Sequence, residues 1–138
     1  MTQRTLAIVK PDALQRRVAG RIIQRIEDEG FQIRAMRRLH LSKEQAEGFY
    51  AVHRERPFFR SLTDFMSSGP VIVMVLEAPE AIKKWRTLMG TTDPAKADPG
   101  TLRKEFGQSI EKNATHGSDA PETAAYEIGY FVAGIELL

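Results

Sequence analysis

The chain has 138 residues, of which 42% are hydrophobic and 28% charged, a composition typical of a folded domain that excludes an intrinsically disordered protein. Its 20 basic and 18 acidic residues leave a net charge of +2, too small an excess for a polycation that coats nucleic acid. Cysteine is absent, which excludes disulfides, thiolate metal sites and cysteine nucleophiles. No apolar run approaches the roughly 20 residues that span a bilayer, and no signal-peptide pattern is present, so we expect one cytoplasmic domain over residues 1–138.

The first third of the chain alternates between strand and helix patterns. Residues 5–9 form an apolar run ended by Lys10, which predicts a buried strand with the lysine at its carboxyl end. Apolar residues at helical spacing follow over residues 18–26, and Gly30 provides the stop. Residues 31–41 then alternate apolar and polar side chains with one interruption, which predicts a half-buried strand with Ile33, Ala35, Leu39 and Leu41 on one face.

Helices and a central strand are predicted in the middle of the chain. Ser42 to Gln45 has the form of a capping box and should open a helix through Tyr50. Residues 59–66 carry helical spacing, and residues 71–76 are six consecutive apolar residues, the best candidate for a central strand.

The last third contains an amphipathic helix over residues 81–89, an irregular loop over residues 91–100, a short strand and a final helix. The final helix is expected over residues 121–131, with Ala124, Ala125, Ile128 and Phe131 on the core side. The order predicts an α/β or α+β sandwich, with helices over one sheet whose strand order stays open.

Several residues are candidates for binding an anion and an aromatic ring. Lys10, Arg86, Thr92 and Arg103 lie at the ends of elements or around the irregular loop, where positive charge and directed donors suit a phosphate, although a lone basic residue is most often a solvated surface charge. Phe58 follows a proline and precedes another phenylalanine, so it either packs in the core or stacks on a base.

His116 is the candidate reactive residue. It lies among small residues, and Gly117 is expected to let the backbone turn sharply or approach a ligand. A structural or surface histidine is the alternative. The chain contains neither a P-loop nor a Rossmann fingerprint, and its three histidines lack metal-ligand spacing. These residues together indicate a phosphate-handling α/β protein.

Six blocks of this sequence resemble the nucleoside diphosphate kinase family, in order and at its spacing. The heptapeptide Asn113-Ala114-Thr115-His116-Gly117-Ser118-Asp119 is similar to the family's active-site signature. The other blocks are Ile8-Val9-Lys10-Pro11-Asp12, Arg56-Pro57-Phe58-Phe59, Ser68-Gly69-Pro70, Gly90-x-Thr92-x-Pro94 and Pro99-Gly100-Thr101-Leu102-Arg103. The resemblance implies a ferredoxin-like α/β sandwich, with a four-stranded antiparallel sheet covered by helices.

The resemblance also implies a reaction: a two-step, ping-pong transfer of the γ-phosphoryl group from a nucleoside triphosphate to a nucleoside diphosphate. His116 would be the nucleophile, and Glu127 would orient its second ring nitrogen. Ser118 would hydrogen-bond Glu127 or shape the turn, Tyr50 would offer its hydroxyl to the phosphate, and Lys10 would contact the transferred group.

Nucleotide binding carries over from the resemblance in the same way. The residues implied are Lys10, Arg86, Thr92 and Arg103 for the phosphates, Phe58 for the base with Leu62 and Ile110 nearby, and Asn113 for a sugar hydroxyl. Mg²⁺ would arrive on the nucleotide phosphates, because no carboxylate cluster in the sequence would hold it alone.

The implied partners are ribo- and deoxyribonucleoside tri- and diphosphates and further copies of this chain. The family forms tetramers or hexamers built from a common dimer, and the short segment after the last helix favours a tetramer. A nucleic-acid-binding protein is disfavoured because the small net charge and scattered basic residues offer no basic stripe. A catalytically silent assembly module is disfavoured because Lys10, His116 and Glu127 are all present.

Overall fold

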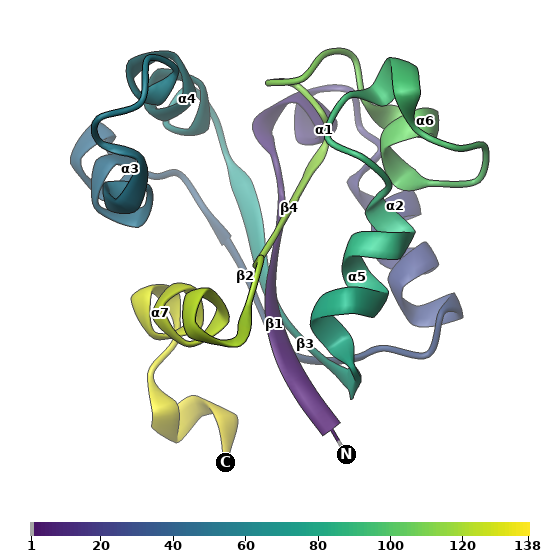
Figure 1. The fold of residues 1–138 in the computed structure, drawn as a ribbon. Helices are drawn as coiled ribbons and strands as arrows, with labels where there is room; N and C mark the ends of the chain where they lie inside the picture. The colour runs from purple at the N-terminus through teal and green to yellow at the C-terminus, as the bar shows by residue number, and fades with distance from the viewer. Residues whose placement is uncertain (1) are drawn as a thin grey trace.

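A four-stranded antiparallel sheet forms the centre of the protein, whose computed structural model describes residues 2–138 (Figure 1). The strands lie in the order β2-β3-β1-β4. Their bounds are β1 Thr2–Val9, β2 Gln32–Leu39, β3 Val71–Pro79 and β4 Thr115–Gly117. This order and pairing are those of a ferredoxin-like fold, as the family resemblance implied, and β3 is central, as its apolar run predicted.

Helices cover both faces of the sheet: α1, α2, α5 and α6 lie on one side, and α3, α4 and α7 lie on the other (Figure 1). Their bounds are α1 Pro11–Gln15, α2 Ala19–Asp28, α3 Lys43–Phe49, α4 Phe59–Met66, α5 Ala81–Met89, α6 Leu102–Phe106 and α7 Pro121–Phe131. Short 3₁₀ helices occupy Ala51–His53, Pro94–Lys96 and Gly134–Leu137. Within residues 2–138, no helix is long and apolar enough to be a transmembrane span.

Burial on both faces explains the apolar run at the start of the chain. In β1, Leu6 and Ile8 belong to the core under α3, α4 and α7, whereas Ala7 and Val9 belong to the core under α2 and α5. Because successive residues of a strand point to opposite faces, a strand covered on both sides is apolar throughout. The same reasoning applies to β3.

A β-bulge in β2 corrects the predicted facing of this strand. Ile33 pairs with Leu76 and Ala35 with Val75, so Arg34 is the extra residue. Ile33 therefore packs on the α2 side, whereas Ala35 and Leu39 pack on the opposite side. The prediction that all of them share one face was wrong, because one inserted residue reverses the alternation.

The predicted helices are confirmed, including the capping box between Ser42 and Gln45, but one position on α7 was wrong. Ala124 is buried and Ile128 and Phe131 are partly buried, whereas Ala125 is exposed. Ala125 lies one residue, or about 100°, around the helix from Ala124 and misses the contact stripe. Instead, the Tyr126 and Tyr130 hydroxyls donate to main-chain carbonyls of α3, which joins α7 to that helix.

Candidate active site

A cavity of about 600 Å³ brings the predicted residues together beside the edge strand β4. All predicted nucleotide-binding residues line it, as do Tyr50 and His116. Its walls come from the α3–α4 segment on one side and the α5–α6 segment on the other, which flank β4 in Figure 1. An adjoining open groove of about 790 Å³ shares Arg86, Thr92 and Arg103 but is lined by neither His116 nor Phe58. We therefore assign the site to the smaller cavity.

His116 is held by its strand and by a carboxylate. Ile8 of β1 pairs with His116 in the sheet register, and the imidazole Nε2 lies 2.9 Å from Glu127 Oε1 on α7. A carboxylate only accepts hydrogen bonds, so Nε2 carries the proton and Nδ1 keeps a free lone pair. The Ser118 hydroxyl donates to the same Glu127 oxygen at 2.9 Å and accepts from the Leu6 N–H at 3.2 Å. The imidazole is thus fixed in one tautomer.

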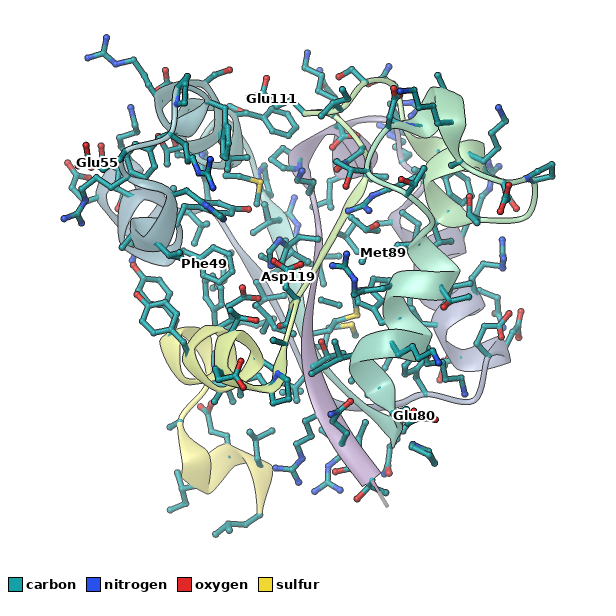
Figure 2. The ribbon with its side chains drawn as sticks, viewed as in Figure 1. Phe49, Glu55, Glu80, Met89, Glu111 and Asp119 are labelled. Atoms are coloured by element: carbon teal, nitrogen blue, oxygen red, sulfur yellow. The ribbon has the colours of Figure 1, made fainter. Side chains whose placement is uncertain are left out.

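Aromatic rings pack edge-on against the imidazole. The centroids of Phe49 and Tyr50 lie 5.3 Å and 6.0 Å from that of His116, at interplanar angles of 70° and 89°. Figure 2 shows Phe49 on the α3 side of β4 and Met89 on the α5 side. Burial raises the pKa of the Tyr50 hydroxyl, and the Glu127 charge raises it further, so Tyr50 is a hydrogen-bond donor at neutral pH.

Gly117 serves close packing and not a turn, which corrects the expectation for the signature heptapeptide. It lies in β4, where a Cβ would come within 2.5 Å of Trp85 Cδ1. The Trp85 indole N–H donates to the His116 carbonyl at 3.1 Å. The left-handed residue is instead Ala114, with a φ of 74°. The heptapeptide therefore contains the short strand β4, which directly follows the left-handed residue Ala114.

Lys10 is a buried cation that lacks a salt bridge within residues 2–138. Its Nζ donates to the Asn113 side-chain oxygen at 2.9 Å and to the Glu111 carbonyl at 3.0 Å. Burial lowers the pKa of Lys10 to about 8, and the positive charge of Arg103 acts in the same direction. A buried ammonium held only by neutral oxygens is well placed to receive an anion.

Two arginines extend this positive charge. Arg103 donates through its two terminal nitrogens to the Gly90 and Thr115 carbonyls, and burial together with the charge of Arg86 lowers its pKa to about 10. Its Nε is buried without a hydrogen-bond partner within the described residues. Arg86 pairs with Asp119 at 2.6 Å, but both side chains are largely exposed, so an incoming phosphate can displace this weak pair.

The outer part of the cavity is apolar. Phe58 is 48% exposed and Ile110 is 62% exposed, and both line the cavity with Leu62. Exposed apolar side chains that converge on a cavity leave a slot for a flat ring. The core-packing alternative for Phe58 is therefore disfavoured.

The Thr92 carbonyl accepts from the Asn113 amide at 3.1 Å, which joins the loop after α5 to the residue before Ala114.

The described residues offer no protein-only metal site. No group of three or more histidine, aspartate or glutamate side chains within residues 2–138 could hold a metal ion. The carboxylates that line the cavity are Asp119, paired with Arg86, and Glu111, which accepts a hydrogen bond from Ser61 at 2.7 Å. These donors fit a metal that brings most of its oxygen ligands with it.

Sequence reasoning missed several residues of the site. His53 lines the cavity with its ring centroid 5.6 Å from that of Phe58, and Glu111, labelled in Figure 2, lines it from the segment before β4 and accepts a hydrogen bond from Ser61 of α4. Asp12 is buried at the start of α1 beside Lys10, and burial raises its pKa. The signals for Asp12 were its place just after the first strand and its presence in the family block Ile8-Val9-Lys10-Pro11-Asp12, but neither gave it a role.

Comparisons with known proteins identify the relatives of this chain. Residues 3–137 match the family model described as nucleoside diphosphate kinase. A nucleoside diphosphate kinase of Desulfovibrio desulfuricans is 62% identical over 137 residues, covering 99% of each chain. One of Trichlorobacter lovleyi is 60% identical over 136 residues, again covering 99% of each chain.

Solved structures give the same result. The nucleoside diphosphate kinase of Aquifex aeolicus aligns over the whole of both chains with a TM-score of 0.97 and 48% identity. A halophilic nucleoside diphosphate kinase from Halobacterium salinarum, solved in complex with CDP, aligns with a TM-score of 0.94 and 38% identity over 100% of this chain and 92% of that chain. With the family model matched along almost the whole sequence, this chain belongs to the nucleoside diphosphate kinase family.

Proposed function

We propose that this chain carries out its family's reaction with His116 as the nucleophile. The reaction class is phosphoryl transfer between nucleotides by a ping-pong route through a phosphohistidine. The observation that carries the assignment of His116 is its hydrogen bond to Glu127, which leaves Nδ1 as the nitrogen with a free lone pair in a ring that lines the same cavity as Lys10 and Arg103. Residues 1–138 would act as a single domain.

Each half-reaction is a simple displacement at phosphorus. The Nδ1 lone pair attacks the γ-phosphorus, an N–P bond forms, and the bond to the bridging β,γ-oxygen breaks with its electron pair on the departing diphosphate. In the second half, a terminal oxygen of another nucleoside diphosphate attacks the phosphohistidine, and the N–P electron pair returns to Nδ1. Glu127 holds Nε2–H throughout and stabilises the positive charge that the ring gains on phosphorylation.

The remaining residues bind and stabilise charge. Lys10, Arg86 and Arg103 surround the phosphates with positive charge, and Lys10 contacts the moving group because it is the most buried of the three. Thr92 and the Tyr50 hydroxyl add hydrogen bonds, and Asn113 reaches a sugar hydroxyl. Charge that is fixed before the phosphoryl group arrives lowers the barrier without reorganisation.

Stacking explains a low selectivity for the base. Phe58 offers one aromatic face, and Leu62 and Ile110 offer apolar contact. Every nucleobase has a π-face, so such a slot accepts purines and pyrimidines alike.

The family's reaction requires a divalent metal ion, which would neutralise part of the negative charge of the phosphates. We propose Mg²⁺, which would be held chiefly by the phosphate oxygens of the nucleotide, because the described residues offer no carboxylate cluster for it. We also propose, from the family resemblance, that the chain assembles into a tetramer or a hexamer built from dimers. A cytoplasmic location is proposed from the sequence.

The proposal is tested by following phosphate through the protein. The chain is incubated with γ-labelled ATP and Mg²⁺, freed of nucleotide, and then given GDP. We expect acid-labile, base-stable label on the protein that moves to GDP, and no label on His116→Ala. His40→Ala is the matched control, because His40 lies outside the cavity with its ring against the Ser67 carbonyl. Label on the His116→Ala protein, or none on the wild type, would refute the proposal.

A further inference from the structure

The strongest feature without a role in this mechanism is the buried carboxylate of Asp12. It is 3% exposed and lies in the first turn of α1, directly after Pro11. Its Oδ2 accepts a hydrogen bond from the Ala114 N–H at 3.1 Å, over 102 residues of sequence. Its Oδ1 is buried without a hydrogen-bond partner within residues 2–138. Burial of this carboxylate costs free energy, which the hydrogen bond from Ala114 and the charges of Lys10 and Arg16 must offset.

The residue that Asp12 contacts is conformationally special. Ala114 is fully buried and has a φ of 74°, a left-handed conformation that costs a non-glycine residue free energy. The Ala114 carbonyl accepts from the Lys10 N–H at 2.8 Å, while its N–H donates to Asp12. The backbone N–H and carbonyl of the strained residue are therefore held by Asp12 and Lys10, the two residues that flank Pro11.

The left-handed residue sets the direction of the chain on both sides. Before it lies Asn113, whose side-chain oxygen accepts from Lys10 Nζ at 2.9 Å. After it, Thr115 and His116 enter β4 and pair with Val9 and Ile8 of β1. If Ala114 returned to an ordinary conformation, the path of the chain between Asn113 and the sheet would change.

We propose that Asp12 is a positioning residue for phosphoryl transfer, which holds the Ala114 peptide left-handed and so places Asn113, Lys10 and His116 in one arrangement. This inference rests on the function proposed above. Asp12 does not line the cavity, so it positions the site through the backbone of Ala114, in addition to the charge by which it raises the pKa of Lys10. It differs from a purely stabilising role because its loss misplaces the nucleophile and the sugar-binding residue together.

A double-mutant cycle tests the coupling between the carboxylate and the strained peptide. Asp12→Ala should lower kcat/KM about 10- to 100-fold, the size expected when a buried donor loses its partner in a transition-state assembly. In an Ala114→Gly background the same substitution should cost less than about 5-fold, because glycine adopts the left-handed conformation without strain. Asp12→Asn, which keeps an oxygen for the Ala114 N–H, should retain more activity than Asp12→Ala.

Controls separate positioning from stability and from the proposed function. Ile26→Val removes a methylene from a fully buried residue of α2, so it should lower the melting temperature while retaining kcat/KM. A wild type that forms no phosphohistidine would refute the proposed function and not this inference.

If the wild type is active, three results would overturn the inference. The first is a kcat/KM of Asp12→Ala within twofold of wild type, and the second is an equal loss in the glycine background. The third is a matching loss in Ile26→Val at equal destabilisation. If Asp12→Ala alone fails to fold, the double variant with Ala114→Gly is expected to fold, and its failure would also overturn the inference.

Discussion

Adding a single methyl group to Gly117 should damage both the stability and the activity of this protein. A Cβ on Gly117 would lie 2.5 Å from Trp85 Cδ1, 2.7 Å from Trp85 Nε1 and 2.6 Å from Met89 Cε. The methionine methyl can rotate away. The indole cannot, because it is fully buried, packs edge-on against Phe31 and donates to the His116 carbonyl.

The magnitude follows from these contacts. Overpacking of a rigid buried neighbour costs about 1–3 kcal/mol. Loss of the hydrogen bond from the Trp85 indole to the His116 carbonyl would add about 1 kcal/mol. We therefore expect Gly117→Ala to lower the free energy of unfolding by about 2–4 kcal/mol. Because β4 carries His116, relief of the clash by movement of the strand should also lower kcat/KM.

Urea denaturation measures the loss in the free energy of unfolding. The protein concentration is kept fixed so that any subunit association contributes equally for each variant. Gly129→Ala in α7 is the matched control, since nothing lies within 4 Å of a Cβ at Gly129. That variant should be more stable than wild type by about 0.5–1 kcal/mol, because alanine is the better helix former. A Gly117→Ala protein as stable as wild type would refute the packing argument.

Three further predictions address the chemistry. The kcat/KM of the free enzyme should fall as the pH rises through about 8, because Lys10 must be protonated to bind phosphate and burial, with the charge of Arg103, lowers its pKa to about 8; a pH–rate profile without this alkaline limb would contradict the role of Lys10. Glu127→Gln should slow phosphohistidine formation about 10- to 100-fold in rapid-quench measurements, since the amide orients Nε2 but no longer stabilises the ring's positive charge, and an unchanged rate would exclude that role. Phe58→Ala should weaken the binding of ADP, GDP and CDP by about 1–3 kcal/mol each, measured by calorimetry, and a loss of affinity confined to one base would exclude a general stacking role.

Strands and long helices could be predicted from the sequence because their burial pattern is local. Residues 5–9 and 71–76 read as buried strands since helices cover both faces of the sheet. By contrast, α1 and α6 have five residues each, too few to show a helical period, and neither was predicted. The bulge at Arg34 was also invisible, because no local feature of that arginine marks it as the inserted residue.

The candidate site divides in the same way. Position in the chain singled out Lys10, Arg86, Arg103, Phe58 and His116, whereas Tyr50 and Glu127 came only from the family resemblance. Sequence reasoning assigned backbone freedom to Gly117 because glycine is the usual left-handed residue. In the structure the left-handed residue is Ala114, whose N–H donates to Asp12. Gly117 is instead required to be small because the indole of Trp85 packs against it. Both assignments depend on residues distant in sequence, which local patterns cannot supply.

The phosphorylated ring nitrogen offers the most direct test of the central claim, that His116 attacks phosphorus through Nδ1 while Glu127 holds Nε2. The protein is phosphorylated with ATP, kept at alkaline pH, and examined by ³¹P NMR together with mass spectrometry of its peptides. We predict one phosphohistidine, on Nδ1 of His116. Phosphate on Nε2, or on any other residue, would contradict the claim.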